Sequence, residues 1–231
     1  MSIHATFHVP FSLLSQAVIV YIVSSKFMEK VYNMSSERDS RTKILAAALA
    51  LIRRRNGADV SLGEIARAAR LSRQAVYLHF SDRADLLIAL VRYVDDERGL
   101  AEKLRNITEA PSGLAAMREM VALQASDNPA LWPMVRVFDA DRHRDPAVER
   151  SWQDRLEHRL GGCRAIVARL RAEKALRPGL SPAAAADLLW TITSLRMWGD
   201  LVVERGWSAE RYQEHVNRLL LVTLTNAVPE S

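Results

Sequence analysis

The stretch from Ser61 to Phe80, SLGEIARAARLSRQAVYLHF, carries the side chains of this chain that are best suited to a nucleic acid. Arg73, Gln74 and Ala75 stand at the start of its second half, directly after a serine that can cap a helix. An arginine pairs with guanine O6 and N7, a glutamine with adenine N6 and N7, and a methyl group packs on the thymine methyl. We therefore predict that these three residues read bases in a DNA major groove.

Polar and basic side chains around these three residues could hold the DNA backbone. Tyr77, His79 and Arg83 follow at spacings that suit phosphate contacts, and the amide groups at a helix N-terminus add a positive dipole end. Ser61 and Ser72, each able to cap a helix, complete the predicted set of backbone contacts. The same pattern also fits an ordinary helical hairpin with a solvated polar face, and this stretch alone leaves both interpretations open.

The elements that must position these residues are two short helices joined by a sharp turn. Ser61 and Glu64, three residues apart, form a capping box at the start of the first helix. Apolar side chains then recur at helical spacing on both sides of a gap at about Arg70 and Leu71. Two helices that cross over so short a gap form a helix-turn-helix, whose second helix can enter a major groove.

The run from about Arg41 to Leu90 resembles the N-terminal DNA-binding domain of the TetR family of bacterial transcriptional regulators. The matching segments are RTKILAAALALI, VSLGEIARAARLS and YLHFSDRADLL. The resemblance implies that the early positions of the second helix face the bases, and that the tyrosine, histidine and arginine named above contact phosphates. The chain departs from the family pattern at Arg70, where glycine normally takes the left-handed turn conformation. It departs again at Gln74, where glycine is usual.

The whole chain of 231 residues is predicted to be all-α, because strand patterns are nearly absent and helical periods of Ala, Leu and Arg run throughout. Its formal net charge is +5, and the basic excess lies in one part. Residues 41–92 hold ten Lys and Arg against four Asp and Glu, whereas residues 93–231 hold nineteen against twenty. This distribution suits a phosphate-binding surface on the first part.

The single Cys163 cannot form an intramolecular disulfide, which fits a reducing cytoplasm.

The first residues of the chain fit poorly with the rest. The apolar run Phe11–Val23 is too short for a membrane span, so we expect no membrane partner. We interpret translation as beginning at Met34 or Met28; the alternative is an amphipathic helix that packs on the body or touches a membrane surface. The expected parts are an N-terminal extension (1–33), a three-helix helix-turn-helix DNA-binding domain (34–92) and a larger α-helical effector-binding and dimerisation domain (93–231).

Apolar periodicity predicts further helices on both sides of the hairpin. The first helix ends in three arginines, Arg53, Arg54 and Arg55. They form either a solvated face or a surface from which one of them contacts a DNA phosphate. A left-handed cap at Asn56 and Gly57 is expected to end this helix. A turn that interrupts the helical pattern, followed by the start of another helix, is predicted at Asp127, Asn128 and Pro129. The expected helices are Arg41–Arg55, a linking helix from Asp82 to about Arg105, Pro111–Ser126, a long helix from Pro146, Pro182–Gly206 and Ala209–Ala227.

The last two expected helices are apolar on more than one face, so they must be buried on several sides. Pairing with a second copy through a four-helix bundle is the natural solution, and we expect a homodimer built on these two helices. The resemblance implies the same assembly, in which the two DNA-binding domains (the heads, one from each chain) reach the two half-sites of a palindromic double-stranded DNA operator.

The resemblance also implies a cavity in the second domain for a small, largely apolar effector. The residues chosen to line it are Trp132, Phe138, Trp190 and Trp198. Aromatic side chains at helical spacing are equally typical of an ordinary core, so both interpretations stay open.

No group of residues predicts catalysis, a cofactor or a metal site. Asp139, Asp141, His143 and Asp145 alternate by two, whereas helical ligands stand three or four apart, and these four fit a helix end and the next cap. Neither a nucleophile with its base nor a phosphate-binding glycine loop is found. The predicted function is a ligand-responsive transcriptional repressor released from its operator by the effector. The alternative is an α-helical small-molecule-binding protein or enzyme in which the helix-turn-helix is only structural.

Overall fold

The computed structural model of the chain describes residues 38–57 and 59–226. The expected N-terminal extension (1–33) and the expected start at Met34 lie outside these residues. The described chain is helical apart from its connections and an isolated β-bridge between Leu176 and Thr225, which confirms the all-α prediction. None of the helices in this described part is long and apolar enough to cross a membrane.

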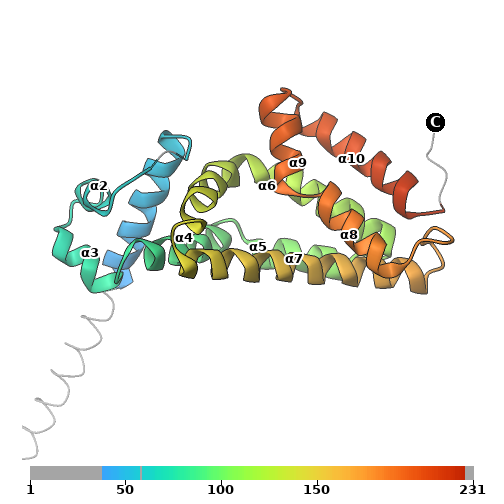
Figure 1. Cartoon of the computed structure of the whole chain (residues 1–231), viewed down its shortest axis with the longest axis horizontal. Helices are drawn as coiled ribbons and strands as arrows, with labels where there is room; N and C mark the ends of the chain where they lie inside the picture. Colours follow the sequence, from blue (N-terminus) through green and yellow to red (C-terminus); the bar gives the residue numbers. More distant parts are fainter. Residues whose placement is uncertain (1–37, 58, 227–231) are drawn as a thin grey trace, which may run out of the picture. The chain divides into compact units, whose positions relative to one another are not determined.

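The chain divides into two compact units, Met1–Ile44 and Leu45–Ser231. In the first unit, the described residues 38–44 are helical. The expected domain boundary between residues 92 and 93 falls within the second unit and stays a prediction. The second unit begins with a helical stretch over residues 45–54 and continues, as labelled in Figure 1, with α2 (Leu62–Ala68), α3 (Arg73–His79), α4 (Arg83–Glu97), α5 (Leu100–Glu109), α6 (Gly113–Arg142), α7 (Pro146–Ala172), α8 (Pro182–Ile192), α9 (Leu195–Trp198), the π-helix η1 (Gly199–Glu204) and α10 (Ala209–Leu224).

Local signals place α2 and α3 as the sequence predicted. The Ser61 hydroxyl accepts a hydrogen bond from Glu64 N, and the Glu64 carboxylate accepts one from Ser61 N at 2.9 Å, so the capping box is complete. Ser72 Oγ caps α3 by accepting from Ala75 N at 3.1 Å. Arg70 in the turn has a φ of 57°, so an arginine does take the left-handed conformation that glycine usually occupies.

The helical stretch before α2 ends at two residues with positive φ, Asn56 at 49° and Gly57 at 80°, which confirms the expected left-handed cap. This cap lies against α6. A Cβ on Gly57 would be 2.6 Å from the carbonyl oxygen of Pro133 and 2.7 Å from Arg136 Cβ. Arg136 Nη1 donates a hydrogen bond to Asn56 O at 2.9 Å. The entry to the helix-turn-helix is therefore docked on α6.

The expected linking helix after Asp82 is two helices rather than one. Asp82 caps α4, as expected, by accepting a hydrogen bond from the backbone amide three residues on. α4 ends at Glu97 with Arg98 as its C-cap residue, and Gly99, with a φ of 60°, turns the chain into α5. Arg98 and Lys103 both form ion pairs with the buried Asp127 of α6. The bend between α4 and α5 is thus held by ionic contacts that link residues distant in sequence.

The expected break at Asp127, Asn128 and Pro129 was wrong. α6 runs for 30 residues through Pro129 and Pro133. A proline removes one helical hydrogen bond and crowds the carbonyl four residues earlier, but its fixed φ is compatible with a helix. Apolar burial on both sides of the prolines offsets that cost, because Val121 and Ala125 before them and Met134, Val137 and Phe138 after them are buried. Tertiary packing overrides the local signal here.

The expected single helix from Pro182 to Gly206 is also divided. α8 ends at Ile192, and the buried Thr193 turns its hydroxyl back to donate to a carbonyl of α8. Ser194 then caps the short helix α9 by accepting from Met197 N at 3.1 Å. The π-helix η1 follows directly. Such π-turns are rare and occur often at functional sites.

The apolar core of the body lies among α6, α7, α8 and α10 (Figure 1). α7 packs against α6 and α8, and α10 packs against the same two helices. Asp145 caps α7 and Pro146 takes its first helical position, as the sequence indicated. Fully buried side chains in this core include Met117, Leu170, Leu189, Tyr212 and Leu220.

Candidate nucleic-acid interface

The N-terminal end of α3 presents the three residues that the sequence assigns to base reading. Arg73 and Gln74 are exposed, and Ala75 is half-buried. Val76 and Phe80 are almost completely buried, and this anchors the other face of α3 in the protein. The first turn of α3 is therefore open to a partner on one side and fixed on the other.

The residues assigned to phosphate contacts surround this open turn in sequence and mostly lie at the surface. Ser61 and Ser72 are exposed at the starts of α2 and α3, and Tyr77 is 56% exposed. His79 is half-buried, with its ring tilted against that of Phe80 at a centroid separation of 6.4 Å. Exposed hydroxyl and phenol groups at the ends of two short helices are suited to hydrogen bonding with phosphate oxygens.

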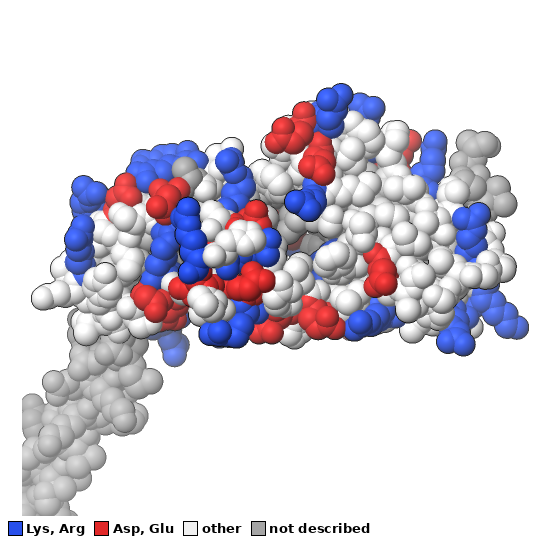
Figure 2. Space-filling view, viewed as in Figure 1, with Lys and Arg blue, Asp and Glu red and all other residues white. Residues whose placement is uncertain are grey.

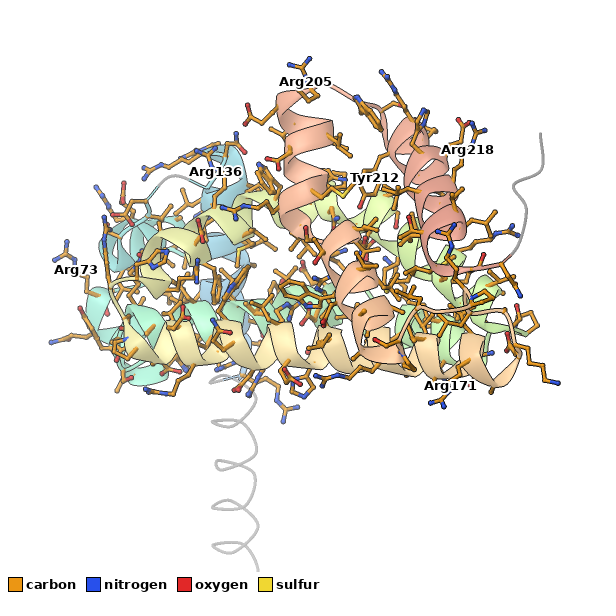
Figure 3. The ribbon with its side chains drawn as sticks, turned by 45° about the vertical axis from the view of Figure 1, so that its right-hand side comes forward. Arg73, Arg136, Arg171, Arg205, Tyr212 and Arg218 are labelled. Carbon is orange, nitrogen blue, oxygen red and sulfur yellow. The ribbon has the colours of Figure 1, made fainter. Side chains whose placement is uncertain are left out.

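The guanidinium of Arg73 packs against α2 at Gly63. A Cβ added to Gly63 would be 2.6 Å from Arg73 Nη2 and 2.8 Å from Arg73 Nε. Gly63 therefore leaves the space that the guanidinium occupies against the first turn of α2. Figure 3 shows Arg73 at the edge of the molecule, where its side chain reaches away from the helices of the body.

An open groove of about 590 Å³ runs beside these residues. Basic and acidic side chains both line it, as Figure 2 shows for the same end of the second unit, where Lys and Arg alternate with Asp and Glu. The basic and hydroxyl-bearing residues of the lining are Arg73, Arg83, Arg144, Tyr77 and Ser61, and the acidic ones are Asp59, Asp141 and Asp145. The groove thus contains cations for phosphates together with carboxylates that compete for them.

Arg83 is the clearest case of that competition. Its Nε donates to Asp141 Oδ2 at 2.8 Å, and its Nη2 lies 2.8 Å from Asp59 Oδ1. Its Nη1 also donates to the carbonyl of Val60. In this structure Arg83 links α4 to α6 and to the loop before α2, so its predicted phosphate contact requires that some of these bonds be released.

A second ionic contact stiffens the start of α2. Arg55 Nη2 lies 2.6 Å from Glu64 Oε1, and Ser61 N and Oγ donate to Glu64 Oε2 at 2.9 and 2.8 Å. The hydrogen bond from Arg55, followed by those from the backbone and hydroxyl of Ser61, lowers the pKa of Glu64 to about 2. Glu64 therefore stays ionised. Arg55, one of the three arginines at the end of the first helix, stabilises the start of α2 through its ion pair with Glu64.

Comparison with known proteins places this arrangement in a family. Residues 44–90 match the profile of the bacterial regulatory proteins of the tetR family. The chain is 26% identical over 167 residues to the nucleoid occlusion factor SlmA of Marinomonas sp. (strain MWYL1), which is 68% of this chain and 81% of that protein. It is 32% identical over 84 residues to the HTH-type transcriptional regulator AcrR of Shigella flexneri, which is 36% of this chain and 39% of that protein. The chain belongs to the TetR family.

A solved structure of similar fold covers most of the chain. NalD, described as the secondary repressor of the MexAB-OprM multidrug efflux pump in Pseudomonas aeruginosa, is 23% identical with a TM-score of 0.60. The match covers 84% of this chain and 100% of NalD. As a TetR-family protein, the chain is a DNA-binding transcriptional regulator with an N-terminal helix-turn-helix domain and a larger helical domain.

The body of this TetR-family protein brings some of the expected effector-site residues together and separates others. Trp132 and Trp198 have ring centroids 5.6 Å apart. Gly199 makes that approach possible, because a Cβ there would be 2.2 Å from the Trp132 ring. Phe138 instead stacks on Trp152 at 6.2 Å. The ring of Trp190 lies under the guanidinium of Arg159, and its Nε1 donates a hydrogen bond to the Leu156 carbonyl oxygen at 3.4 Å.

Asp139, Asp141, His143 and Asp145 lie at the end of one helix and the start of the next, as their spacing in the sequence predicts. Asp139 and Asp141 are in the last turn of α6, His143 is its C-cap residue, and Asp145 caps α7. Asp139 pairs with Arg142 at 2.8 Å. Across the described residues no cluster of three or more His, Cys, Asp or Glu could hold a metal ion.

Sequence reasoning missed the residues that restrain the TetR-type head. Asp59 and Asp141 hold Arg83, but no pattern in the sequence relates positions so far apart. It also missed Arg159, although a signal was present. Arg159 stands three residues after Leu156 and four before Cys163, both on the apolar face of α7, so helical spacing places a charge on the inner face.

Proposed function

We propose that this TetR-family protein is a repressor that binds a palindromic operator as a homodimer and leaves it when a small effector binds. The observation that carries the proposal is the open first turn of α3, with its buried anchor. In a major groove, Arg73, Gln74 and Ala75 read bases. Ser61, Ser72, Tyr77, His79 and Arg83 hold the backbone.

Dimerisation through α8 and α10 is supported by the apolar side chains that these helices expose. Leu188 of α8 is 37% exposed, and Leu219 and Val222 of α10 are 41% and 45% exposed. Leu219 and Val222, three residues apart, share one face of α10. Because α8 packs against α10, a second copy can cover all three, as an isologous four-helix contact requires.

Release by an effector is supported by the way the body holds the head. Asn56 accepts a hydrogen bond from α6, and Arg83 and Arg98 form ion pairs with carboxylates of α6. A shift of α6 would therefore move the helix-turn-helix. An effector that binds only one arrangement of α6 shifts the population of head positions. The expected lining, Trp132, Phe138, Trp190 and Trp198, suits a ligand with a largely apolar surface. A repressor role is supported by the description of NalD.

The experiment that tests the proposal is selection of bound duplexes from a random DNA library at near-physiological salt. We expect enrichment of a palindrome whose half-sites are spaced for a two-fold dimer. A promoter carrying that palindrome should then be silenced by the protein in a reporter strain, and activation instead of silencing would contradict the repressor role. Absence of any enriched sequence would favour the alternative, a small-molecule-binding protein or enzyme in which the helix-turn-helix is only structural.

A further inference from the structure

Arg159 is a part-buried cation in the middle of the apolar body. It projects from α7 towards the end of α8, where Nη1 donates to Thr193 O at 3.1 Å and to Thr193 Oγ1 at 3.2 Å. Nη2 donates to Trp190 O at 2.6 Å. The Cζ atom lies 4.7 Å from the centroid of the Trp190 ring. A guanidinium at the C-terminal end of a helix caps free carbonyls, and this accounts for the three bonds.

Those bonds leave one edge of the guanidinium without an acceptor. A guanidinium has five N–H donors, and the acceptors of Arg159 in the described chain are the three oxygen atoms just named. The N–H of Nε and one N–H of Nη2 remain. Nε and Nη2 lie on the same edge of the guanidinium, and an edge of this kind can receive the two oxygens of a carboxylate.

No negative charge in the described part of the chain compensates Arg159. The titratable groups that interact with it electrostatically are Cys163 and Tyr212, and burial lowers the pKa of Arg159 itself. Burial also raises the pKa of Cys163 to about 11 and that of Tyr212 to about 12, so both stay neutral at physiological pH. Buried charges in proteins are normally paired, because an isolated one is costly to remove from water.

The surroundings of this cation are apolar and aromatic. Cys163, Tyr212 and Trp190 belong to the same hydrophobic cluster. The chain that leaves Thr193 enters α9, where Trp198 is 2% exposed and its Nε1 has no hydrogen-bond partner. A buried donor without an acceptor is a second, independent indication of a ligand with acceptor atoms in this part of the body.

We propose that the effector is an organic carboxylate with an aromatic body, whose carboxylate pairs with the free Nε and Nη2 edge of Arg159. This inference rests on the proposed function, because it names the ligand class of the proposed effector site. It adds a charged group to the largely apolar ligand that the aromatic side chains suggest. The aromatic body of the ligand lies among the tryptophans of α8 and α9.

Matched probes test the charge directly. Benzoate, 2-naphthoate and 4-biphenylcarboxylate are each compared by calorimetry with the corresponding amide, which keeps the rings and removes the charge. We expect at least one carboxylate to bind about tenfold or more tightly than its amide, as a charge-assisted bidentate contact implies. If no carboxylate of the series binds more tightly than its amide, the inference is wrong.

A pair of variants locates the contact. Arg159→Gln should remove the preference for the carboxylate, whereas Arg171→Gln, which makes the same charge change at an exposed position of α7, should keep it. Figure 3 shows Arg171 on the outer side of the bundle, whereas Tyr212 lies on the side of α10 that faces the other helices. A preference that persists in Arg159→Gln, or one that Arg171→Gln abolishes, would contradict the assignment. If Arg159→Gln does not fold, the wild-type probe comparison still decides.

The probe series and the operator selection fail separately. The selection is carried out without any probe, so a protein that binds a palindrome but shows no preference for carboxylates refutes only this inference. A carboxylate preference without DNA binding refutes the proposed function and leaves a carboxylate-binding protein.

Discussion

Arg83 Nε lies 2.8 Å from Asp141 Oδ2, so a side chain that the sequence assigns to DNA phosphates is held by a carboxylate of α6. The same guanidinium lies 2.8 Å from Asp59. A phosphate can gain Arg83 only in competition with these carboxylates. The contact between the body and the head is therefore also a restraint on DNA binding.

Replacing Asp141 by Asn should strengthen binding to duplex DNA of any sequence, because Arg83 is released towards phosphate. One added phosphate contact should steepen the dependence of log K on log salt by roughly 0.9. Titration of a labelled duplex at several salt concentrations measures both effects. Asp139→Asn is the matched control, since it makes the same charge change in the same turn of α6 but removes a carboxylate from Arg142, which keeps its ion pair with Glu149. Equal effects of the two variants would show that only net charge matters.

Removing the Arg73 side chain should relax specificity at one base pair. We expect Arg73→Ala to cost about 1–3 kcal/mol of binding free energy at that pair and to leave the fold intact, because Arg73 is exposed. Tyr77→Phe should instead weaken binding to all sequences alike. Repeating the library selection with each variant separates the two. An unchanged sequence preference in Arg73→Ala would show that α3 has been assigned the wrong role.

Gly57 should tolerate no side chain, because of both its φ and its contact with α6. Gly57→Ala places a Cβ 2.6 Å from the Pro133 carbonyl oxygen, whereas Gly179, with an almost identical φ of 82°, has no atom within 4 Å of such a Cβ. Both variants carry the backbone strain, so Gly57→Ala should be less stable than Gly179→Ala by about 1–3 kcal/mol from overpacking. Urea denaturation measures the difference. Equal stabilities would mean that the docking of the cap on α6 is loose.

Glu64 should make stability fall with acid in a definite range. Its pKa in the folded protein is about 2, below the ordinary value of 4.5, so its contribution is complete above about pH 4.5 and is lost as the pH falls towards 2. Melting temperatures of the wild type and of Glu64→Gln should therefore converge between pH 4.5 and 2. A difference between the two melting temperatures that stays constant over this range would contradict the role of Glu64.

The proposed dimer should depend on Leu219. Leu219→Glu places a charge on the exposed apolar face of α10, and the charge must be desolvated in a dimer. We expect the mass measured by light scattering to fall towards that of one chain. Leu104→Glu changes a leucine of α5 that is 46% exposed and should leave the mass unchanged. A dimer that survives Leu219→Glu would place the interface elsewhere.

The sequence by itself determined the features that depend on neighbouring residues. The capping box of Ser61 and Glu64, the caps at Ser72 and Asp82, and the turn at Arg70 involve groups within one or two helical turns, so residue types and spacing specify them. The exposed start of α3 followed from the same local pattern. The TetR resemblance over this part could therefore be predicted without any structure.

Only the tertiary structure decided how distant residues meet. α6 continues through Pro129 and Pro133 because burial on both sides outweighs what the prolines cost, and α8 ends where Arg159 reaches across from α7. Phe138 pairs with Trp152 rather than with the tryptophans of α8 and α9. Arg83 meets Asp141, 58 positions away. Contacts of this kind depend on how helices cross and what they bury, and helical periodicity within a single helix does not contain that information.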